Sequence, residues 1–224
     1  MNQETYEVEI KCLLGERANA DRLHAKMKEM DPDLKDLGAH KQLNHYFEGA
    51  GDFKKAAEAI PSADDRQSFL DLASKAKSFS LRTRDADGKI LLVLKAAVDD
   101  TTSANGTARR EVEVPAGNSL DALDATLLAA RFTYQAKWSR ERNTYTFKGT
   151  TVTIDKNAGY GYLAEFEEIV TDPAQLDAAK AKLRTLIAEL GIQELDAARL
   201  ERMFAYYNTH WPEYYGTEKV FNVA

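Results

Sequence analysis

The sequence predicts an α+β fold with an antiparallel sheet or barrel at its centre and helices packed around it. Two observations lead to this prediction: short runs of alternating apolar and polar residues, and longer segments with apolar residues at helical spacing. Turn signals at residues 85–88 and 148–150 join some of the alternating runs closely, as antiparallel pairing requires.

Eight segments show the period-two alternation that is typical of strands. They are residues 6–13, 42–47, 78–84, 89–97, 108–114, 139–148, 150–155 and 163–171.

Four other segments place their apolar residues on one helical face. They are residues 17–30, 120–132, 173–190 and 195–207. Ser119 is a suitable N-cap for the second segment, Asp172 and Pro173 form a suitable start for the third, and Gly191 ends it.

Two stretches lie outside this pattern of strands. Residues 49–77 are polar, helix-prone and broken at Pro61, so we expect a helical insertion, and residues 172–224 form a helical C-terminal segment. Because no linker divides the chain, we expect residues 1–224 to be one domain.

Composition narrows the class of protein. Hydrophobic residues make up 44% and charged residues 29% of the chain, as in globular proteins, and no apolar run is long enough to cross a bilayer. Cys12 is the only cysteine, so no internal disulfide forms and a cytoplasmic location is expected. The net charge of −6 argues against binding to duplex nucleic acid, and we expect no membrane partner.

Charged residues recur at alternate positions of the predicted strands, so they share strand faces. The set comprises Glu7, Glu9 and Lys11, then Arg82 and Arg84, Lys95, Glu111 and Glu113, Arg140 and Arg142, Asp155, and Glu165 and Glu167. For any one strand, the simplest interpretation is a solvent-facing side of a sheet. Across all strands, however, arginine pairs suit phosphate oxygens and carboxylate pairs suit hard divalent cations. If the sheet closes with this face inward, it would bind Mg²⁺ or Mn²⁺ together with a polyphosphate.

The first strand resembles a family signature. Its residues Glu7 to Lys11 are similar to the Glu-x-Glu-x-Lys motif of the CYTH superfamily, the triphosphate tunnel metalloenzymes. Other segments resemble the family's further motifs in the same order. They are residues 42–47, 81–84, 94–95, 110–113 and 140–145, then Asp155, residues 159–161 and residues 165–167. The resemblance extends over about residues 5–170.

This resemblance implies a closed eight-stranded antiparallel β-barrel, the triphosphate tunnel, with helices packed outside. It implies metal ligands at Glu7, Glu9, Glu165 and Glu167, with Asp155, Glu111 and Glu113 as further candidates. For Glu111 and Glu113, ion pairs with barrel arginines are an equal alternative. Phosphate would be bound by Lys11, Arg82, Arg84, Lys95, Arg140 and Arg142.

The family resemblance also suggests a catalytic pair, Lys11 and Tyr46. A lysine crowded by other cations can lose its proton near neutral pH and act as a general base. The alternative is that Lys11 binds only a phosphate oxygen and that Tyr46 is a packing residue.

The predicted activity is hydrolysis of a triphosphate, with tripolyphosphate, ATP and thiamine triphosphate as possible substrates. One alternative is a class IV-type adenylyl cyclase that releases cyclic AMP and pyrophosphate, and another is a non-catalytic polyphosphate-binding module. The sequence leaves open whether the protein is a monomer or a homodimer. The four histidines lack metal-ligand spacing, and Cys12 is predicted to be a packed thiol.

Overall fold

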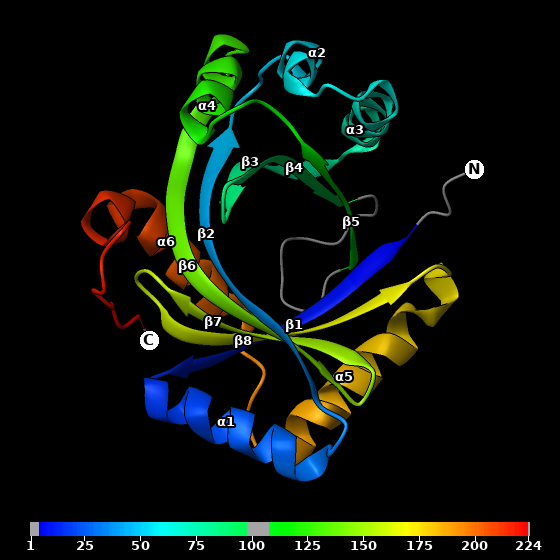
Figure 1. Ribbon diagram of the computed structural model, residues 1–224, viewed down its shortest axis with the longest axis vertical. Coiled ribbons are helices and arrows are strands. Elements are labelled where there is room, and N and C mark those ends of the chain that lie inside the picture. Colours follow the sequence, from blue (N-terminus) through cyan, green and yellow to red (C-terminus); the bar gives the residue numbers. More distant parts are fainter. Residues whose placement is uncertain (1–4, 98–107, 224) are drawn as a thin grey trace. The chain divides into compact units, whose positions relative to one another are not determined.

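The computed structural model describes residues 5–97 and 108–223, which contain eight strands and six α-helices (Figure 1). The strands are β1 (Tyr6–Gly15), β2 (Lys35–Glu48), β3 (Ser78–Ala86), β4 (Lys89–Ala97), β5 (Ala108–Pro115), β6 (Thr133–Phe147), β7 (Thr150–Asn157) and β8 (Gly161–Val170). The helices are α1 (Arg17–Met30), α2 (Phe53–Ala56), α3 (Ala63–Lys75), α4 (Leu120–Ala129), α5 (Leu176–Leu190) and α6 (Ala197–Tyr214), with 3₁₀ turns η1 (Ala57–Ala59) and η2 (Pro173–Gln175).

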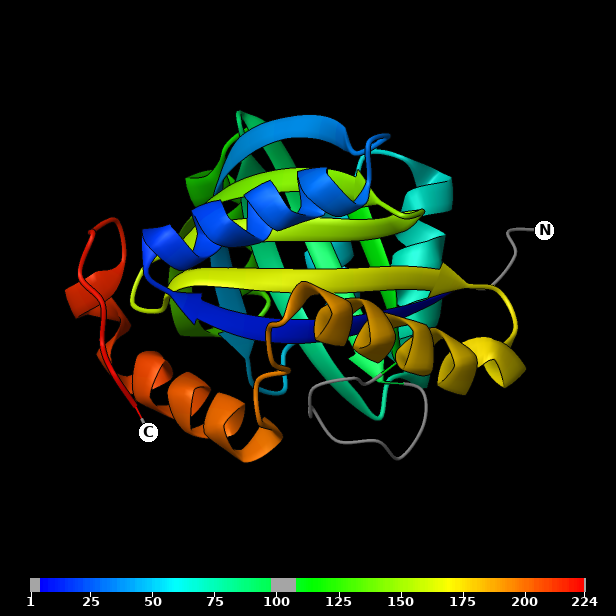
Figure 2. The same ribbon diagram turned by 90° about the horizontal axis from the view of Figure 1, so that it is seen from below.

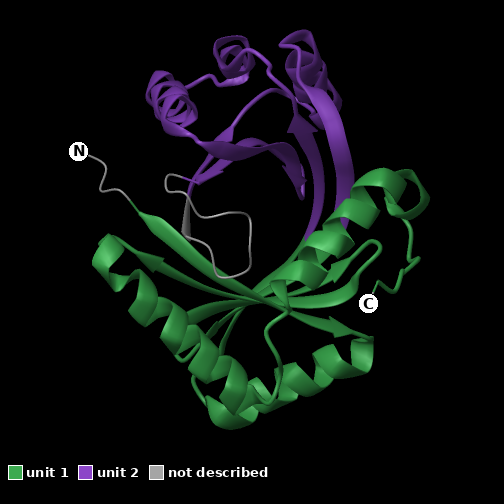
Figure 3. Ribbon diagram, turned by 180° about the vertical axis from the view of Figure 1, so that it is seen from behind, with its two compact units in different colours: residues 1–40, 101–108, 140–224 green, residues 41–100, 109–139 purple. Residues whose placement is uncertain are grey.

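The chain divides into two compact units (Figure 3). Unit 1 contains the described residues within 1–40, 101–108 and 140–224, and unit 2 those within 41–100 and 109–139. Strands pair antiparallel inside each unit, which confirms the predicted α+β class. Closure of the strands into a single barrel, and the prediction of one domain, stay predictions.

In unit 1, β1 pairs with β8, β8 with β7, and β7 with β6. The register places Lys11 opposite Glu165, and Arg142 opposite Asp155. Burial alternates strictly along β1, where Val8 and Ile10 are fully buried and the charged residues between them are only partly buried. One face of this sheet is therefore polar and the other apolar, because strand side chains alternate between faces.

Helices α1 and α5 pack against the strands of unit 1 (Figure 2). Leu23 and Met27 of α1, and Leu183 and Ile187 of α5, are buried in one core with the apolar side chains of β1 and β8. Each such side chain contributes about 1.5–3 kcal/mol of burial free energy. The apolar face of the sheet is thus covered, and the charged face is the one left for ligands.

In unit 2, β2, β3, β4 and β5 pair in that order. The register places Tyr46 opposite Arg82 and Lys95 opposite Glu111. Leu81 and its cross-strand neighbour Leu94 point to the other face and are fully buried in a second core. The same division into a charged and an apolar face is therefore repeated in this unit.

Residues 49–77 contain α2, η1 and α3, and these helices belong to the core of unit 2. Asp52 caps α2, and Ser62 caps α3 directly after Pro61. Phe53 makes edge-to-face contact with Phe132, the ring that also fills the space where a side chain on Gly51 would lie. The insertion therefore has its own helix caps and packs against the core of unit 2.

Several element boundaries differ from the prediction. Strand β2 begins at Lys35 rather than at residue 42, because residues 35–41 do not alternate in polarity. Strand β6 begins at Thr133 rather than at residue 139, although residues 133–138 do alternate in polarity. Helix α4 ends at Ala129, since Arg131 adopts a positive φ of 68°. Helix α6 continues to Tyr214 because its buried stripe persists beyond Tyr207 and Pro212 does not stop it.

The C-terminal segment covers the turn that leads into β8. Gly159 has a φ of +81°, and its backbone N–H donates to the carbonyl of Lys219 while its own carbonyl accepts from Phe221. A side-chain carbon at Gly159 would lie 2.8 Å from the Phe221 ring, so only glycine fits there. Among the described helices, none is both long and apolar enough to cross a membrane.

Candidate functional site

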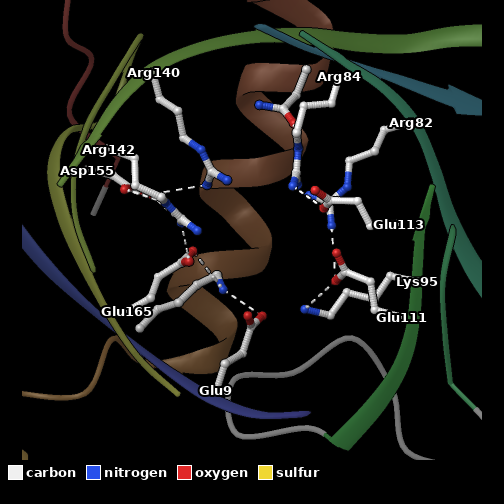
Figure 4. Close-up of polar contacts among 12 residues, drawn as sticks. Glu9, Arg82, Arg84, Lys95, Glu111, Glu113, Arg140, Arg142, Asp155 and Glu165 are labelled. Atoms are coloured by element: carbon white, nitrogen blue, oxygen red, sulfur yellow. Dashed lines mark hydrogen bonds and ion pairs between the residues drawn. The ribbon is translucent and has the colours of Figure 1, made fainter. Parts of the chain in front are cut away.

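The charged face of unit 1 holds a cluster that we call cluster 1: Glu9, Lys11, Arg140, Arg142, Asp155 and Glu165 (Figure 4). Its members come from β1, β6, β7 and β8 at alternate strand positions. Because cross-strand neighbours point to the same side of a sheet, the register alone brings these side chains together.

Asp155 anchors the basic half of cluster 1. Its carboxylate is fully buried and accepts from Arg142 Nε at 2.8 Å, from Arg142 Nη2 at 2.6 Å and from Arg140 Nη1 at 3.1 Å. Two of these bonds form the parallel fork that a guanidinium makes with a carboxylate. Burial alone would lower the pKa of Arg142, but the charges of Asp155 and Glu165 raise that pKa well above its ordinary value. Arg142 is therefore held as a permanent cation.

Lys11 and Glu165 form the second half of cluster 1. Lys11 Nζ lies 2.7 Å from Glu9 Oε1 and 3.1 Å from Glu165 Oε1, and Glu165 also accepts from Arg142 at 2.5 Å. Burial raises the pKa of Glu165, but the charges of Lys11, Arg142 and Arg140 outweigh this effect and hold that pKa well below its ordinary value. Glu165 is therefore ionised throughout the neutral range.

The other two predicted ligands on these strands, Glu7 and Glu167, lie on the same face. Glu167 is the cross-strand neighbour of Glu9, whereas Glu7 lies opposite Ile169, which is exposed. Within residues 5–97 and 108–223, no three histidine, cysteine, aspartate or glutamate side chains gather closely enough to form a metal-binding group. Glu9 and Glu165 are instead bound to Lys11.

The charged face of unit 2 holds cluster 2: Asn44, Tyr46, Arg82, Arg84, Lys95, Glu111 and Glu113. Arg84 Nε donates to Asn44 Oδ1 at 2.8 Å, and its Nη1 binds Glu113. Arg82 donates to the Tyr46 hydroxyl at 2.8 Å, and its guanidinium carbon lies 5.3 Å from the centre of the Tyr46 ring. Both arginines are thus fixed by neutral partners on β2 as well as by carboxylates.

Glu111 completes cluster 2 from β5. One of its oxygens lies 3.4 Å from Lys95 Nζ and 3.6 Å from Arg82 Nη2. The side chains of Lys95, Arg82 and Arg84 are only 7%, 10% and 9% exposed, although all three are cations. A buried cation needs hydrogen-bond partners and an opposite charge, and Glu111 and Glu113 supply them. The structure therefore contains the ion pairs that were the alternative to metal binding for these two glutamates.

The pattern of the CYTH domain matches residues 5–200, which is most of the chain. The chain belongs to the CYTH family. This confirms the resemblance that the motifs on β1, β3 and β8 indicated.

Several solved structures share the CYTH fold of this chain. A conserved hypothetical protein from Pyrococcus furiosus is 19% identical, with a TM-score of 0.60, and the match covers 85% of this chain and 93% of that protein. A proposed adenylyl cyclase from Hippeastrum, described as having a dominant triphosphatase activity, is 21% identical with a TM-score of 0.53, covering 89% and 95%. A proposed adenylate cyclase from Vibrio parahaemolyticus is 16% identical with a TM-score of 0.55, covering 85% and 91%. No curated protein sequence matches this CYTH chain.

Most of the predicted site residues lie in one of the two clusters of this CYTH protein. Arg140 and Arg142 lie in cluster 1, and Arg82, Arg84 and Lys95 lie in cluster 2 (Figure 4). Lys11 also belongs to cluster 1, and Tyr46 belongs to cluster 2. Asn44 lies in the predicted strand at residues 42–47, but its role as the partner of Arg84 was not predicted. The available signal was its position, two residues before Tyr46 and on the same strand face. Cys12 points to the opposite face, where burial raises the pKa of its thiol to about 12.

Proposed function

We propose that this CYTH protein is a metal-dependent hydrolase that cleaves a phosphoanhydride bond of a triphosphate. The observation that carries the proposal is the set of three nearly buried cations in cluster 2, Arg82, Arg84 and Lys95. Polar side chains on neighbouring strands hold these cations on one strand face before any ligand binds. Cations fixed in advance stabilise the charge of phosphoryl oxygens without reorganisation at the moment of reaction.

Cluster 1 supports the same proposal, although its three cations are matched by three carboxylates. Arg140 and Arg142 are proposed to bind phosphoryl oxygens, and Lys11 is proposed to take the proton from the attacking water. At present Glu9 and Glu165 contact the Lys11 ammonium and favour its charged form, so a base role requires those contacts to loosen. Tyr46, whose hydroxyl accepts from Arg82, stays a proposed catalytic residue.

Carboxylates of these strands are the proposed ligands of a divalent cation. The donor set of Glu7, Glu9, Glu165 and Glu167, with Asp155, Glu111 and Glu113, offers only oxygen atoms, as Mg²⁺ and Mn²⁺ prefer. A bound cation of this kind neutralises charge on the phosphoryl oxygens. Asp155 is fully buried and forms ion pairs with Arg140 and Arg142, so it holds these two arginines in place.

Closure of the eight strands into one triphosphate tunnel, as the family resemblance implies, belongs to this proposal. A class IV-type adenylyl cyclase is the second candidate, and it is favoured by the fold neighbours described as proposed cyclases. Both reactions need a polyphosphate held by arginine and lysine side chains, so the two clusters support either one. The Hippeastrum neighbour, described under the cyclase name with a dominant triphosphatase activity, favours hydrolysis as the first candidate.

Product analysis separates these reactions. The purified protein is incubated with Mg²⁺ or Mn²⁺ and with tripolyphosphate, ATP or thiamine triphosphate, with an excess of chelator as the matched control. We expect orthophosphate and a diphosphate from at least one substrate, and no turnover with chelator. Cyclic AMP and pyrophosphate would identify a cyclase, whereas full turnover in chelator would exclude the metal-dependent mechanism.

Two substitutions test the assignment of the clusters. Glu9→Gln is expected to lower the rate by at least ~10²-fold, the scale for losing one electrostatic group at a reaction centre. Arg84→Ala is expected to weaken tripolyphosphate binding, which calorimetry measures. If Arg84→Ala binds tripolyphosphate as the wild type does, cluster 2 is structural and does not bind phosphate.

A further inference from the structure

Behind the charged face of unit 2, on the side of the helices, lies a buried polar network. Asp124 of α4 accepts from the Thr83 hydroxyl at 2.6 Å and from the Tyr134 hydroxyl at 2.7 Å, and its carboxylate lies 2.6 Å from His45 Nδ1. Asp124, His45 and Thr83 are 3%, 3% and 0% exposed. We call these four residues the Asp124 network.

Asp124 is ionised in this setting. Burial raises its pKa, but the hydrogen bonds from His45, Thr83 and Tyr134 together lower that pKa below its ordinary value. An ionised carboxylate only accepts hydrogen bonds, so the proton between Asp124 and His45 resides on His45 Nδ1. Three donors from three different strands, β2, β3 and β6, therefore converge on one charged side chain of α4.

The strand positions of these donors connect the network to cluster 2. Thr83 lies between Arg82 and Arg84 on β3, and His45 lies between Asn44 and Tyr46 on β2. His45 and Thr83 are themselves cross-strand partners, as are Tyr46 and Arg82. Side chains alternate between strand faces, so each donor is flanked by two residues of cluster 2 that point the opposite way.

We infer that Asp124 is a positioning residue, which fixes the backbones of β2 and β3 from behind and thereby holds Arg82 and Arg84 in their places for phosphate. The register of a strand decides which residues face the ligand, and a buried, charged acceptor pins that register at one residue of each strand. Hydrophobic contacts on the same face do not specify position as narrowly, because they have no directional preference.

Thr83 offers the mildest test, since replacing Asp124 could prevent folding. Thr83→Val keeps the branched shape and removes the hydroxyl, whereas Thr83→Ser keeps the hydroxyl. The matched control is Leu127→Ala, because Leu127 is fully buried on the same helix and belongs to the apolar core rather than to the network. Urea unfolding of both variants checks that Leu127→Ala is at least as destabilised as Thr83→Val.

The first measurement is the hydrogen-exchange rate of the Arg84 Nε–H group by NMR, since this group donates to Asn44. Losing one hydrogen bond to a charged acceptor corresponds to about a tenfold change in an equilibrium. We therefore expect Thr83→Val to accelerate this exchange by about tenfold, and Thr83→Ser and Leu127→Ala to leave it within about twofold of wild type. Unchanged exchange in Thr83→Val, or equal acceleration in Leu127→Ala, would overturn the inference.

The second measurement is the affinity for tripolyphosphate, and this arm rests on the proposed function. We expect Thr83→Val to weaken binding by about tenfold and Thr83→Ser to restore it, with Leu127→Ala unaffected. If the wild type does not bind tripolyphosphate, the proposed function fails while the exchange measurement still decides the role of Asp124. If binding is normal in Thr83→Val although wild type binds, the positioning role itself is wrong.

Discussion

Asp155 of β7 should be among the most costly single positions of unit 1 to change. Asp155→Asn keeps the shape of the side chain but replaces one carboxylate oxygen by a donor, so the fork to Arg142 is broken and the Arg140 contact loses its charge partner. Removing one partner of a buried ion pair costs about 3–5 kcal/mol. Arg142 keeps Glu165 at 2.5 Å, so we expect the lower end, about 3 kcal/mol.

The assay is thermal unfolding followed by circular dichroism at pH 7 without ligand. For a chain of this length, a loss of about 3 kcal/mol lowers the melting temperature by about 6–12 °C. Glu201→Gln is the matched control, since Glu201 is an exposed carboxylate on α6, and it should lie within about 0.5 kcal/mol of wild type. A loss of less than about 1 kcal/mol in Asp155→Asn would show that the Arg140 and Arg142 contacts contribute little to stability.

Three further predictions concern other groups of unit 1. Lys11→Arg should preserve triphosphate binding, lower the catalytic rate and remove the acidic limb of the pH–rate profile, whereas an effect on affinity alone would contradict a base role. Since the folded pKa of Glu165 is lowered, its stabilising contribution is complete above about pH 4.5 and is lost as the pH falls through the folded value. Urea unfolding should therefore show that the destabilisation caused by Glu165→Gln is largest near pH 7 and decreases as the pH falls below about 4.5, and a constant difference would refute this assignment. Cys12, buried and with a pKa raised to about 12, should react with a thiol reagent only after unfolding, and rapid labelling of the native protein would contradict its burial.

The sequence predicted those features of the fold that depend on local periodicity. The helix at residues 17–30 has the predicted bounds, because its apolar residues share one face and Asp31 and Pro32 follow it. The strand at residues 89–97 begins where it was predicted, directly after the turn at Asp87 and Gly88. The alternation of charged and apolar residues also predicted which side chains share a face, and Lys11 and Glu165 are cross-strand neighbours. The start of β2 was missed because residues 35–41 do not alternate in polarity, and the start of β6 was missed although residues 133–138 do alternate.

The Asp124 network was not predicted either. Asp124 lies in a helix that the sequence predicts correctly, but nothing in a helical pattern distinguishes a buried aspartate from an exposed one. Its partners His45, Thr83 and Tyr134 are distant along the chain, and the nearest of them is ten residues away. A polar residue among the apolar positions of α4 was the only local sign, since Leu123 and Leu127 are also buried.

The alternation of charge along β3 has a consequence for how the length of this chain can change during evolution. Deleting or inserting one residue beside Leu81 would turn Arg82 and Arg84 into the apolar core and expose the leucine in their place. Such a change cannot occur in small steps, because one insertion or deletion moves every later side chain of the strand to the opposite face. Differences in length among descendants of this sequence should therefore accumulate in connecting segments such as residues 49–77, while the strands change only by substitution.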